Sequence, residues 1–317
     1  MTALWITIGI VVFLLAAVLI AAYVCFYITF YVPESKRVKP GEFVLPPGEE
    51  FEPYREKMTA WNKEVSKLPC EHEEIRSFDG LILHARYYQF KRGAPIEIMF
   101  HGYRGNAERD LCGGIQRCFT LKRNVLLVDQ RASGSSGGKV ITFGVFESRD
   151  CVDWVRFAAN RWPESKLIIT GISMGASTVL MAAAEELPPS VVGVIADCGF
   201  TTAKDIICKC VKDMKLPTKL VYPFIRLGAL LYGKFDPEEN SAVEAVQKTR
   251  LPVIFFHGEK DNFVPYLMSV ENYCVCHSPK RLVGMPEAGH GMSYLVEPER
   301  YLHELRDFEK IMGINDK

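Results

Sequence analysis

Residues 167–177 read LIITGISMGAS, and this stretch decides the fold. An apolar run typical of a buried strand breaks at the pentapeptide GISMG, and a helix-like run follows it. G-x-S-x-G between a strand and a helix predicts a nucleophile elbow, a sharp turn that holds the serine in a strained conformation. A Cβ at Gly171 or Gly175 would collide with the neighbouring strand or helix. The hydroxyl of Ser173 should therefore project clear of the sheet, in front of the backbone N–H groups of the next helix.

A second match to the same pattern surrounds Ser136, in the run GSSGG at residues 134–138. It has no apolar strand before it and no immediate helix after it, so it predicts a loop. We therefore expect Ser173, and not Ser136, to be the nucleophile.

A serine hydroxyl needs a base to take its proton, here a histidine oriented by a carboxylate. In sheets that carry this elbow, the chain order is Ser, acid, His. Asp261 follows the strand-like residues 252–256, and His290 follows residues 281–285 in the glycine-flanked run AGHG. Both lie beyond the carboxyl ends of strands, where parallel sheets form their ligand sites. The sequence predicts a triad of Ser173, Asp261 and His290.

Other residues are alternatives for the same roles. His257 and His101 each follow a strand directly and are alternative bases, although a structural role is commoner at such positions. Asp197, at the end of the strand after the elbow helix, and Glu259 are alternative acids. The remaining histidines have no motif around them.

An oxyanion hole needs two backbone N–H donors. One should be the amide of Met174, which follows the nucleophile, and the other should come from the loop after the strand that ends at Phe100. That loop reads HGYRGN at residues 101–106, and we expect the Tyr103 N–H to be the donor. The Tyr103 side chain is also a candidate lining residue of the acyl pocket.

Strand-like and helix-like stretches alternate after a hairpin signal at Asp79-Gly80. This alternation predicts an α/β fold, a mostly parallel sheet with helices on both faces. A segment at about 200–240 breaks the rhythm, and we expect a small helical cap over the C-terminal edge of the sheet. The strands are expected at 73–78, 81–90, 96–100, 124–129, 167–172, 191–196, 252–256 and 281–285, and the helices at 107–121, 145–160, 174–186 and 297–312.

The cap segment carries a basic run. Its lysines either form a solvated face or contact anionic lipid headgroups beside a membrane anchor. They are Lys204, Lys209, Lys212, Lys215 and Lys219.

Residues 4–32 carry no charged side chain, which is more than the ~20 residues that span a bilayer. We interpret residues 1–32 as an uncleaved transmembrane anchor; a cleaved signal peptide and a buried helix are the alternatives. Lys36, Arg37 and Lys39 follow the span, so the positive-inside rule places the C-terminal domain in the cytoplasm.

Residues 33–70 join this anchor to a catalytic domain at 71–317. The first part is a linker with Pro33, Pro40, Pro46 and Pro47, and a helix is expected to begin at Pro53. Its apolar stripe packs on the catalytic domain or lies on the membrane surface. The stripe consists of Tyr54, Met58, Trp61, Val65 and Leu68.

The formal net charge is zero, so no basic field favours nucleic acid as a partner. The 10 cysteines form no C-x-x-C pair and fit no common zinc spacing, which indicates reduced thiols more than disulfides or a metal site. The predicted triad needs no metal and no cofactor.

Together the motifs resemble the α/β-hydrolase superfamily, over roughly residues 73–317. The resemblance rests on HGYRGN at 101–106, GISMG at 171–175, HGEKD at 257–261 and AGH at 288–290. VDQRASGS at 128–135 is also similar to a loop that is structural in that superfamily, which further demotes Ser136.

Within the superfamily, the chain looks most like membrane-anchored bacterial hydrolases of the serine-aminopeptidase and cinnamoyl-esterase-like branch. The resemblance implies acyl hydrolysis through an acyl-enzyme, and a serine at the elbow argues against the dehalogenases. Small-molecule or lipid carboxylic esters are the expected substrates, followed by thioesters and peptide amides. The alternative from another class is a membrane-tethered binding scaffold on a retired hydrolase fold.

Overall fold

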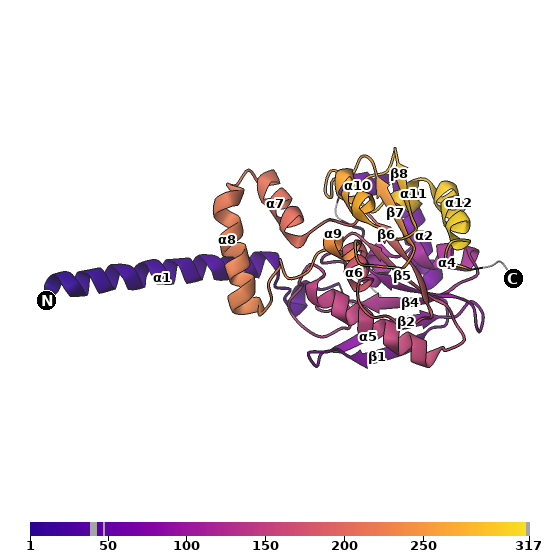
Figure 1. Cartoon of the computed structure of the whole chain (residues 1–317), viewed down its shortest axis with the longest axis horizontal. Helices are drawn as coiled ribbons and strands as arrows, with labels where there is room; N and C mark the ends of the chain where they lie inside the picture. Colours follow the sequence, from indigo (N-terminus) through magenta and orange to yellow (C-terminus); the bar gives the residue numbers. More distant parts are fainter. Residues whose placement is uncertain (39–42, 47, 315–317) are drawn as a thin grey trace.

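The computed structural model describes residues 1–38, 43–46 and 48–314, and its centre is an eight-stranded sheet. The strand order is β1-β2-β4-β3-β5-β6-β7-β8 (Figure 1). β1 and β2 form an antiparallel hairpin, β2 pairs antiparallel with β4, and all the other pairs are parallel. The expected mostly parallel sheet with a hairpin in front is confirmed. The strands are β1 Glu71–Arg76, β2 Ile82–Tyr88, β3 Ile96–Phe100, β4 Asn124–Asp129, β5 Leu167–Ile172, β6 Val191–Asp197, β7 Val253–Gly258 and β8 Lys280–Met285.

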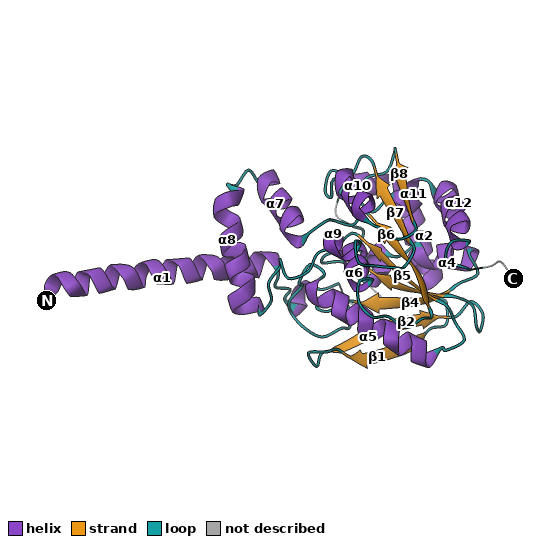
Figure 2. Ribbon diagram, in the orientation of Figure 1, coloured by secondary structure: helices purple, strands orange, loops and turns teal. Residues whose placement is uncertain are grey.

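Helices cover both faces of this sheet (Figure 2). Neighbouring strand residues alternate between two cores: Ile169 and Phe255 pack in the larger core, Ile168 and Phe256 in the smaller one. This is the period of two that a strand buried on both faces requires. The helices of the domain are α3 Ala107–Asp110, α4 Gly114–Thr120, α5 Val145–Arg161, α6 Met174–Ala182, α9 Ala242–Ala245, α10 Tyr266–Val275, α11 Ser293–Val296 and α12 Pro298–Glu309.

Two helices differ from the sequence prediction. The single helix expected at 107–121 is two short helices, because the chain breaks before Gly113-Gly114, where glycine disfavours a continuous helix. The helix expected to reach residue 186 ends at Ala182 and continues as a turn.

A buried charge network ties β3 to the helices on one face. Glu97 is fully buried on β3 and bonds to both Arg117 and Arg123, and Arg123 also bonds to Glu309. Burial raises the pKa of the Glu97 carboxyl, but the charges of the two arginines outweigh it, so the pKa is lowered and the group is an anion. Thr170 on β5 donates a further hydrogen bond of 3.1 Å to Glu97.

The N-terminal helix α1, Thr2–Thr29, is long and apolar enough to cross a membrane and projects from one end of the domain (Figure 1). Its C-terminal end belongs to the hydrophobic core: Phe30 is 0% exposed, and Phe26 and Val32 are almost as deeply buried. The Val32 N–H donates to the Lys139 carbonyl, and the Ile141 N–H donates to the Phe30 carbonyl. The C-terminal end of α1 and the residues after it are therefore packed and hydrogen-bonded into the sheet domain.

The helical insertion expected at about 200–240 is present between β6 and β7. It consists of α7 Ala203–Asp213, α8 Thr218–Gly228 and a π-helical turn, Ala229–Gly233. α7 lies beside the loop after β7, where Lys209 contacts Asn262 and Phe263. α8 packs across α1 (Figure 1).

The segment between α1 and β1 contains a 3-10 turn, Glu34–Lys36, a second one, Glu49–Tyr54, and α2, Arg55–Val65. α2 packs on the sheet domain, as one of the two expectations had it: Trp61 stacks on Tyr294 at 5.7 Å between ring centroids, and Lys57 donates to the Leu295 carbonyl. Of the residues expected in the linker and the positive cluster, Lys39, Pro40 and Pro47 lie outside the described residues.

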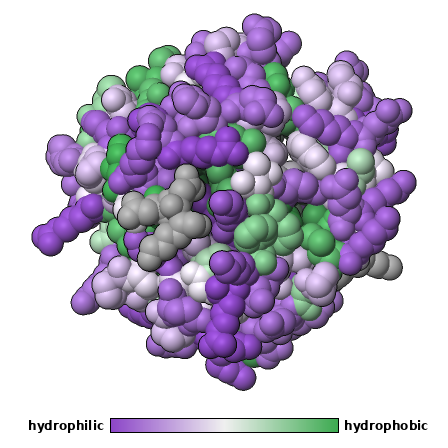
Figure 3. Space-filling view, turned by 90° about the vertical axis from the view of Figure 1, so that its right-hand side faces the viewer, coloured by the Kyte–Doolittle hydropathy of each residue, from purple (hydrophilic) through white to green (hydrophobic). Residues whose placement is uncertain are grey.

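The face of the molecule turned away from α1 is mostly hydrophilic, with a few scattered apolar residues (Figure 3). All 10 cysteines are free, as reduced thiols would be.

Candidate active site

The elbow forms where the sequence predicted it. β5 ends at Ile172, α6 begins at Met174, and Ser173 between them has φ 57° and ψ −120°. This positive φ is a strained conformation for a serine. A Cβ on Gly171 would lie 2.1 Å from the carbonyl group of Gly175, and a Cβ on Gly175 would lie 2.1 Å from the Phe100 carbonyl oxygen. Only glycine allows these approaches, so both expected collisions exist.

Ser173, His290 and Asp261 form one hydrogen-bonded chain. The Ser173 Oγ lies 2.9 Å from His290 Nε2, and His290 Nδ1 lies 2.6 Å from Asp261 Oδ2. The three side chains come from the loops after β5, β8 and β7, so the carboxyl ends of three parallel strands converge. Phe263 packs edge-on against the His290 ring at 5.0 Å between centroids.

The loop after β7 fixes the carboxylate of Asp261. Its Oδ1 accepts hydrogen bonds of 2.8 Å from the N–H groups of Phe263 and Val264. Burial raises the pKa of the carboxyl, but hydrogen bonds from His257 and His290 outweigh it, so the pKa is lowered below its usual range. The group is therefore an anion that orients His290 and can stabilise a positive imidazolium.

Neither alternative base contacts Ser173 in a hydrogen bond among the described residues. His257 is fully buried behind Asp261; its Nδ1 lies 2.7 Å from the Ser269 hydroxyl, and its Nε2 lies 2.9 Å from the Val264 carbonyl oxygen and 3.2 Å from Asp261 Oδ2. His101 is also buried and accepts a hydrogen bond from the Gln130 N–H. Both histidines have structural partners.

The alternative acids do not contact His290 in a hydrogen bond within the described part of the chain. Asp197 accepts a 2.8 Å hydrogen bond from the Ser293 hydroxyl, and burial raises the pKa of its carboxyl. Glu259 makes no ion pair with a histidine among the described residues.

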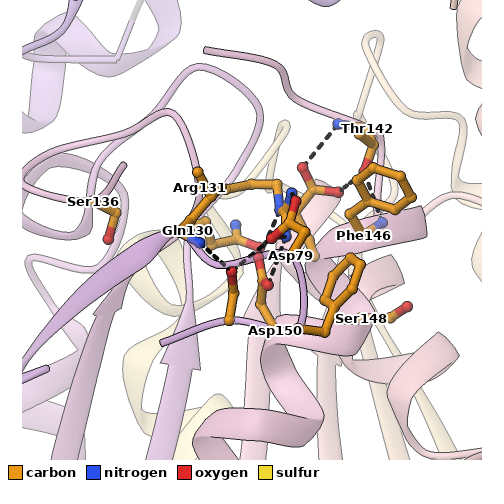
Figure 4. Close-up of polar contacts among 12 residues, drawn as sticks. Asp79, Gln130, Arg131, Ser136, Thr142, Phe146, Ser148 and Asp150 are labelled. Carbon is orange, nitrogen blue, oxygen red and sulfur yellow. Dashed lines mark hydrogen bonds and ion pairs between the residues drawn. The ribbon is translucent and has the colours of Figure 1, made fainter. Parts of the chain in front are cut away.

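Ser136 lies apart from the contacts among Arg131, Asp79 and Asp150 that Figure 4 draws. Its hydroxyl donates to the Asp129 carbonyl and accepts a 2.9 Å hydrogen bond from the His84 N–H. Arg131 itself bridges Asp79 and Asp150. The sequence prediction that this serine sits in a structural loop agrees with these contacts.

The loop after β3 passes close to the nucleophile. A Cβ on Gly102 would lie 3.7 Å from the Ser173 Oγ. Among the described residues, the N–H groups of Tyr103 and Met174 donate to no protein acceptor, so both are available to a bound oxygen. These are the two donors that the sequence analysis selected.

Contacts that the sequence analysis missed hold this loop. The Gly102 N–H donates a 2.9 Å hydrogen bond to Asp110. The Tyr103 hydroxyl donates a 2.6 Å hydrogen bond to the Thr29 carbonyl, at the end of α1, and Arg104 donates to the Ile28 carbonyl at 2.7 Å. No motif marks Thr29 and Ile28 as partners, since they come from a helix whose composition indicates only a membrane span.

A cavity of about 450 Å³ opens beside Ser173 and His290. Most of its wall is apolar, and no residue of the helical insertion at 200–240 contributes to it. The second missed feature is its outer wall, which comes from the segment before the sheet domain. The residues that this segment supplies are Pro46, Glu50, Phe51, Met58 and Trp61. Tyr103 also lines the cavity, as the sequence analysis suggested for an acyl pocket.

One group of side chains has the spacing of metal ligands: Cys198, Asp261 and His290 bring donor atoms within 4.8 Å of one another. Burial raises the pKa of the Cys198 thiol well above its usual value, so the thiolate that a metal needs is disfavoured. Asp261 and His290 already bond to each other. The arrangement fits a proton relay better than a metal site.

Comparisons with known proteins concern the fold of the chain. A family profile described as alpha/beta hydrolase fold matches residues 98–208. The chain is 29% identical over 187 residues to the uncharacterized protein YqkD of Bacillus subtilis, an alignment that covers 58% of this chain and 61% of that protein, less than two thirds of its length. It is 26% identical over 256 residues to the protein bem46 of Schizosaccharomyces pombe, covering 78% of this chain and 79% of that protein.

Solved structures are also similar. The esterase Pf2001 of Pyrococcus furiosus superposes with a TM-score of 0.64 at 23% identity, covering 89% of this chain and 98% of that chain. An esterase of Exiguobacterium antarcticum gives a TM-score of 0.56 at 17% identity, covering 75% of this chain and 98% of that chain. The profile and these superpositions establish the α/β-hydrolase fold for the present chain.

Proposed function

We propose that this chain with the α/β-hydrolase fold is a membrane-anchored serine hydrolase that cleaves carboxylic acyl esters through an acyl-enzyme intermediate. One observation carries the proposal: the continuous hydrogen-bonded chain from the Ser173 Oγ through His290 to Asp261. A nucleophile, a base and an orienting acid at these distances are what acyl transfer requires.

In this mechanism His290 Nε2 takes the proton from the Ser173 hydroxyl as Oγ attacks the acyl carbonyl carbon. Asp261 accepts a hydrogen bond from the Nδ1–H of His290 and stabilises the imidazolium. The N–H groups of Tyr103 and Met174 bind the oxyanion of the tetrahedral intermediate. The imidazolium then gives its proton to the leaving alcohol, and the acyl-enzyme remains. Water, deprotonated by His290, then attacks the acyl carbonyl carbon, and the imidazolium returns this proton to Ser173 Oγ as the acyl–Oγ bond breaks and the acid leaves.

The apolar cavity supports an apolar acyl group. Phe51, Met58 and Leu111 line it together with Ile172 beside the nucleophile. An aliphatic chain gains free energy in such a cavity by leaving water. Lipid acyl esters and thioesters are therefore the nearest alternatives to small esters, and peptide amides would need a polar binding surface in addition.

The proposed anchor is α1, kept in the mature protein. A cleaved signal peptide is disfavoured because cleavage after the span would remove Phe26 and Phe30 from the core. Lys36 and Arg37 follow the helix, which supports a cytoplasmic catalytic domain. Protease that is added outside intact cells should leave this domain whole; its digestion there would reverse the orientation.

The function is tested on the full-length chain in detergent micelles, because the end of α1 is part of the core. We expect hydrolysis of p-nitrophenyl esters in a series from acetyl to palmitoyl, and covalent labelling by a serine-reactive phosphonate. The Ser173→Ala variant should lose both, whereas Ser136→Ala, the matched control in the second G-x-S-x-G run, should keep both.

The outcomes separate the alternatives. The best chain length distinguishes small-ester from lipid chemistry. Phosphonate labelling without ester turnover would favour thioesters or amides. A folded protein that shows neither labelling nor turnover would overturn the hydrolase and favour the binding scaffold. In a phosphonate complex, an oxygen away from the Tyr103 and Met174 amides would refute the assigned oxyanion hole.

A further inference from the structure

We propose that the α7–α8 hairpin is a second membrane-contacting element. It inserts the apolar surface of α8 into the leaflet on the side of the catalytic domain, and it binds anionic headgroups beside α1. We call this surface, together with the exposed apolar residues on either side of α8, the cap patch. It comprises Leu220 and Pro223 on α8, Met214 and Leu216 in the turn before it, and Leu230 and Leu231 in the π-helical turn after it. The inference rests on the proposed anchor and leaves the proposed chemistry independent.

The hairpin is docked on α1 rather than on the cavity. A Cβ on Gly228 would lie 2.3 Å from the Ala22 carbonyl oxygen, so a glycine is needed where the two helices cross. The Tyr232 hydroxyl donates a 3.1 Å hydrogen bond to the Leu19 carbonyl, and its ring packs edge-on against Tyr23 at 5.2 Å. Small residues at a crossing and side-chain hydrogen bonds across it are typical of helix pairs in membranes.

These contacts set the depth of the hairpin. α1 has 28 residues. At 1.5 Å per residue it is about 42 Å long, and the ~30 Å hydrocarbon core takes about 20 residues. Tyr23, Tyr27 and Tyr31, at or just after the C-terminal end of α1, are typical of a membrane interface. A hydrocarbon core that stops before them ends near Ala22, which is where α8 crosses. The C-terminal end of α8 therefore lies at the boundary between hydrocarbon and headgroups.

At this depth, the outer surface of α8 is apolar. Leu220 is 62% exposed, and Leu230 and Leu231 are also exposed, while Tyr222 and Ile225 on the inner side are buried. Leu220, Pro223 and Leu227 recur at intervals of three and four, so they follow one stripe along α8, and the exposed Leu230 and Leu231 follow in the π-helical turn. Contact with lipid explains why a helix next to a bilayer span exposes an apolar stripe on its outer side.

Cations surround the tip of the hairpin. Lys212, Lys215 and Lys219 are exposed and, within the described part of the chain, form no ion pair, whereas the neighbouring Asp213 is paired with Lys209. Lysines beside an inserted apolar tip are attracted to anionic lipids, and their long stems allow the ammonium groups to reach the headgroups. The face of the molecule turned away from α1 is largely hydrophilic (Figure 3).

The test uses full-length protein in liposomes, with a photoreactive amino acid at one site and a fluorescent phospholipid. Leu220 and Leu231 report on the cap patch. Leu14, exposed on α1, reports on the anchor itself. Ile311, 44% exposed near the C-terminus at the far end of the molecule, is the matched negative control (Figure 1).

We expect lipid labelling at Leu14, Leu220 and Leu231 that is at least tenfold above labelling at Ile311. Labelling at Leu14 with none at the two cap sites would overturn the cap patch and leave the anchor standing. No labelling at Leu14 would overturn the anchor, and the cap patch with it. Ester hydrolysis by the same samples reports separately on the chemistry.

A charge variant tests the lipid class. We expect labelling at Leu220 to rise severalfold when phosphatidylglycerol replaces phosphatidylcholine. Exchange of Lys212, Lys215 and Lys219 for glutamate should abolish that rise. The matched variant exchanges the exposed Lys63, Lys67 and Lys122, on other elements, and should keep it. An equal loss of the rise in both variants would refute a role for these particular lysines.

Discussion

The hydroxyl of Tyr103 donates a 2.6 Å hydrogen bond to the carbonyl oxygen of Thr29, which lies 74 positions earlier in the chain. This bond joins the last turn of the apolar helix to the loop whose backbone is proposed to bind the oxyanion. Burial raises the pKa of the Tyr103 phenol to about 12, so it stays a hydrogen-bond donor at every physiological pH.

Tyr103→Phe keeps the backbone N–H and removes only this bond. A buried hydrogen bond is worth about 1 kcal/mol, so we expect kcat to fall by about two- to tenfold, with little change in KM. This loss is smaller than the ~100-fold or more for a missing oxyanion donor, because the loop shifts without losing its amide. Steady-state kinetics in micelles measure the effect.

Tyr222→Phe is the control, since the Tyr222 hydroxyl bonds to Glu238 in the insertion and not to the loop. Unchanged kcat in Tyr103→Phe, or an equal fall in both variants, would show that the end of α1 does not position the loop.

The triad variants should lose kcat to different extents. His290→Ala should lose nearly all kcat, because the proton of Ser173 then has no acceptor. Asp261→Asn should lose less kcat, since His290 remains as the base and only its orientation and the stabilisation of its imidazolium weaken. Rates of p-nitrophenyl ester hydrolysis at matched protein stability give the ranking. Greater damage from Asp261→Asn than from His290→Ala would contradict the assigned roles.

Ser136→Ala should keep its activity and lose stability. Removing the hydroxyl leaves the Asp129 carbonyl and the His84 N–H without this partner, at a cost of about 1–3 kcal/mol. Urea unfolding followed by tryptophan fluorescence measures the change. A stable but inactive Ser136→Ala variant would refute the structural role.

The stability that Asp261 contributes should depend on pH. The pKa of its carboxyl is lowered in the folded state, so this contribution is present above the unfolded value of about 4 and is lost as the pH falls below it. The difference in unfolding free energy between wild type and Asp261→Asn should shrink as the pH falls below about 4. A difference that widens on acidification would contradict the lowered pKa.

Glu97→Gln should destabilise the domain strongly. The variant leaves two buried guanidinium groups without their shared anion, and breaking a buried pair costs about 3–5 kcal/mol. Glu52→Gln breaks an exposed pair with Arg55 and should have no measurable effect on unfolding. Similar unfolding curves for the two variants would show that the network contributes little.

Local sequence patterns were enough to predict the elbow, the order of the triad and the alternation of strands and helices. Each depends on a few adjacent residues: Gly171 and Gly175 permit the turn, and the glycines beside His290 form its loop. Tyr103 and Met174 could also be proposed as oxyanion donors, since their places follow from the elbow and the end of β3, and this assignment stays a prediction.

The walls of the site could not be predicted in this way. Lys57 meets the Leu295 carbonyl across 238 positions, and Tyr103 meets Thr29 across 74. Such contacts depend on how packed elements are rotated against one another, which no local pattern fixes. The apolar stripe on α2 indicated a packed helix but not that this helix would line the cavity. Nothing in the sequence of α8 indicated that this helix would pack on α1.

The burial of Phe30 also bears on how the protein is made. With α1 in a bilayer as we propose, this ring leaves the ribosome before any of the strands that later surround it. The sheet is then completed around a helix end that lipid already holds. Because α1 is made and inserted first, its position in the bilayer would set the orientation of the catalytic cavity relative to the membrane. The domain would then fold at the lipid surface rather than in free solution.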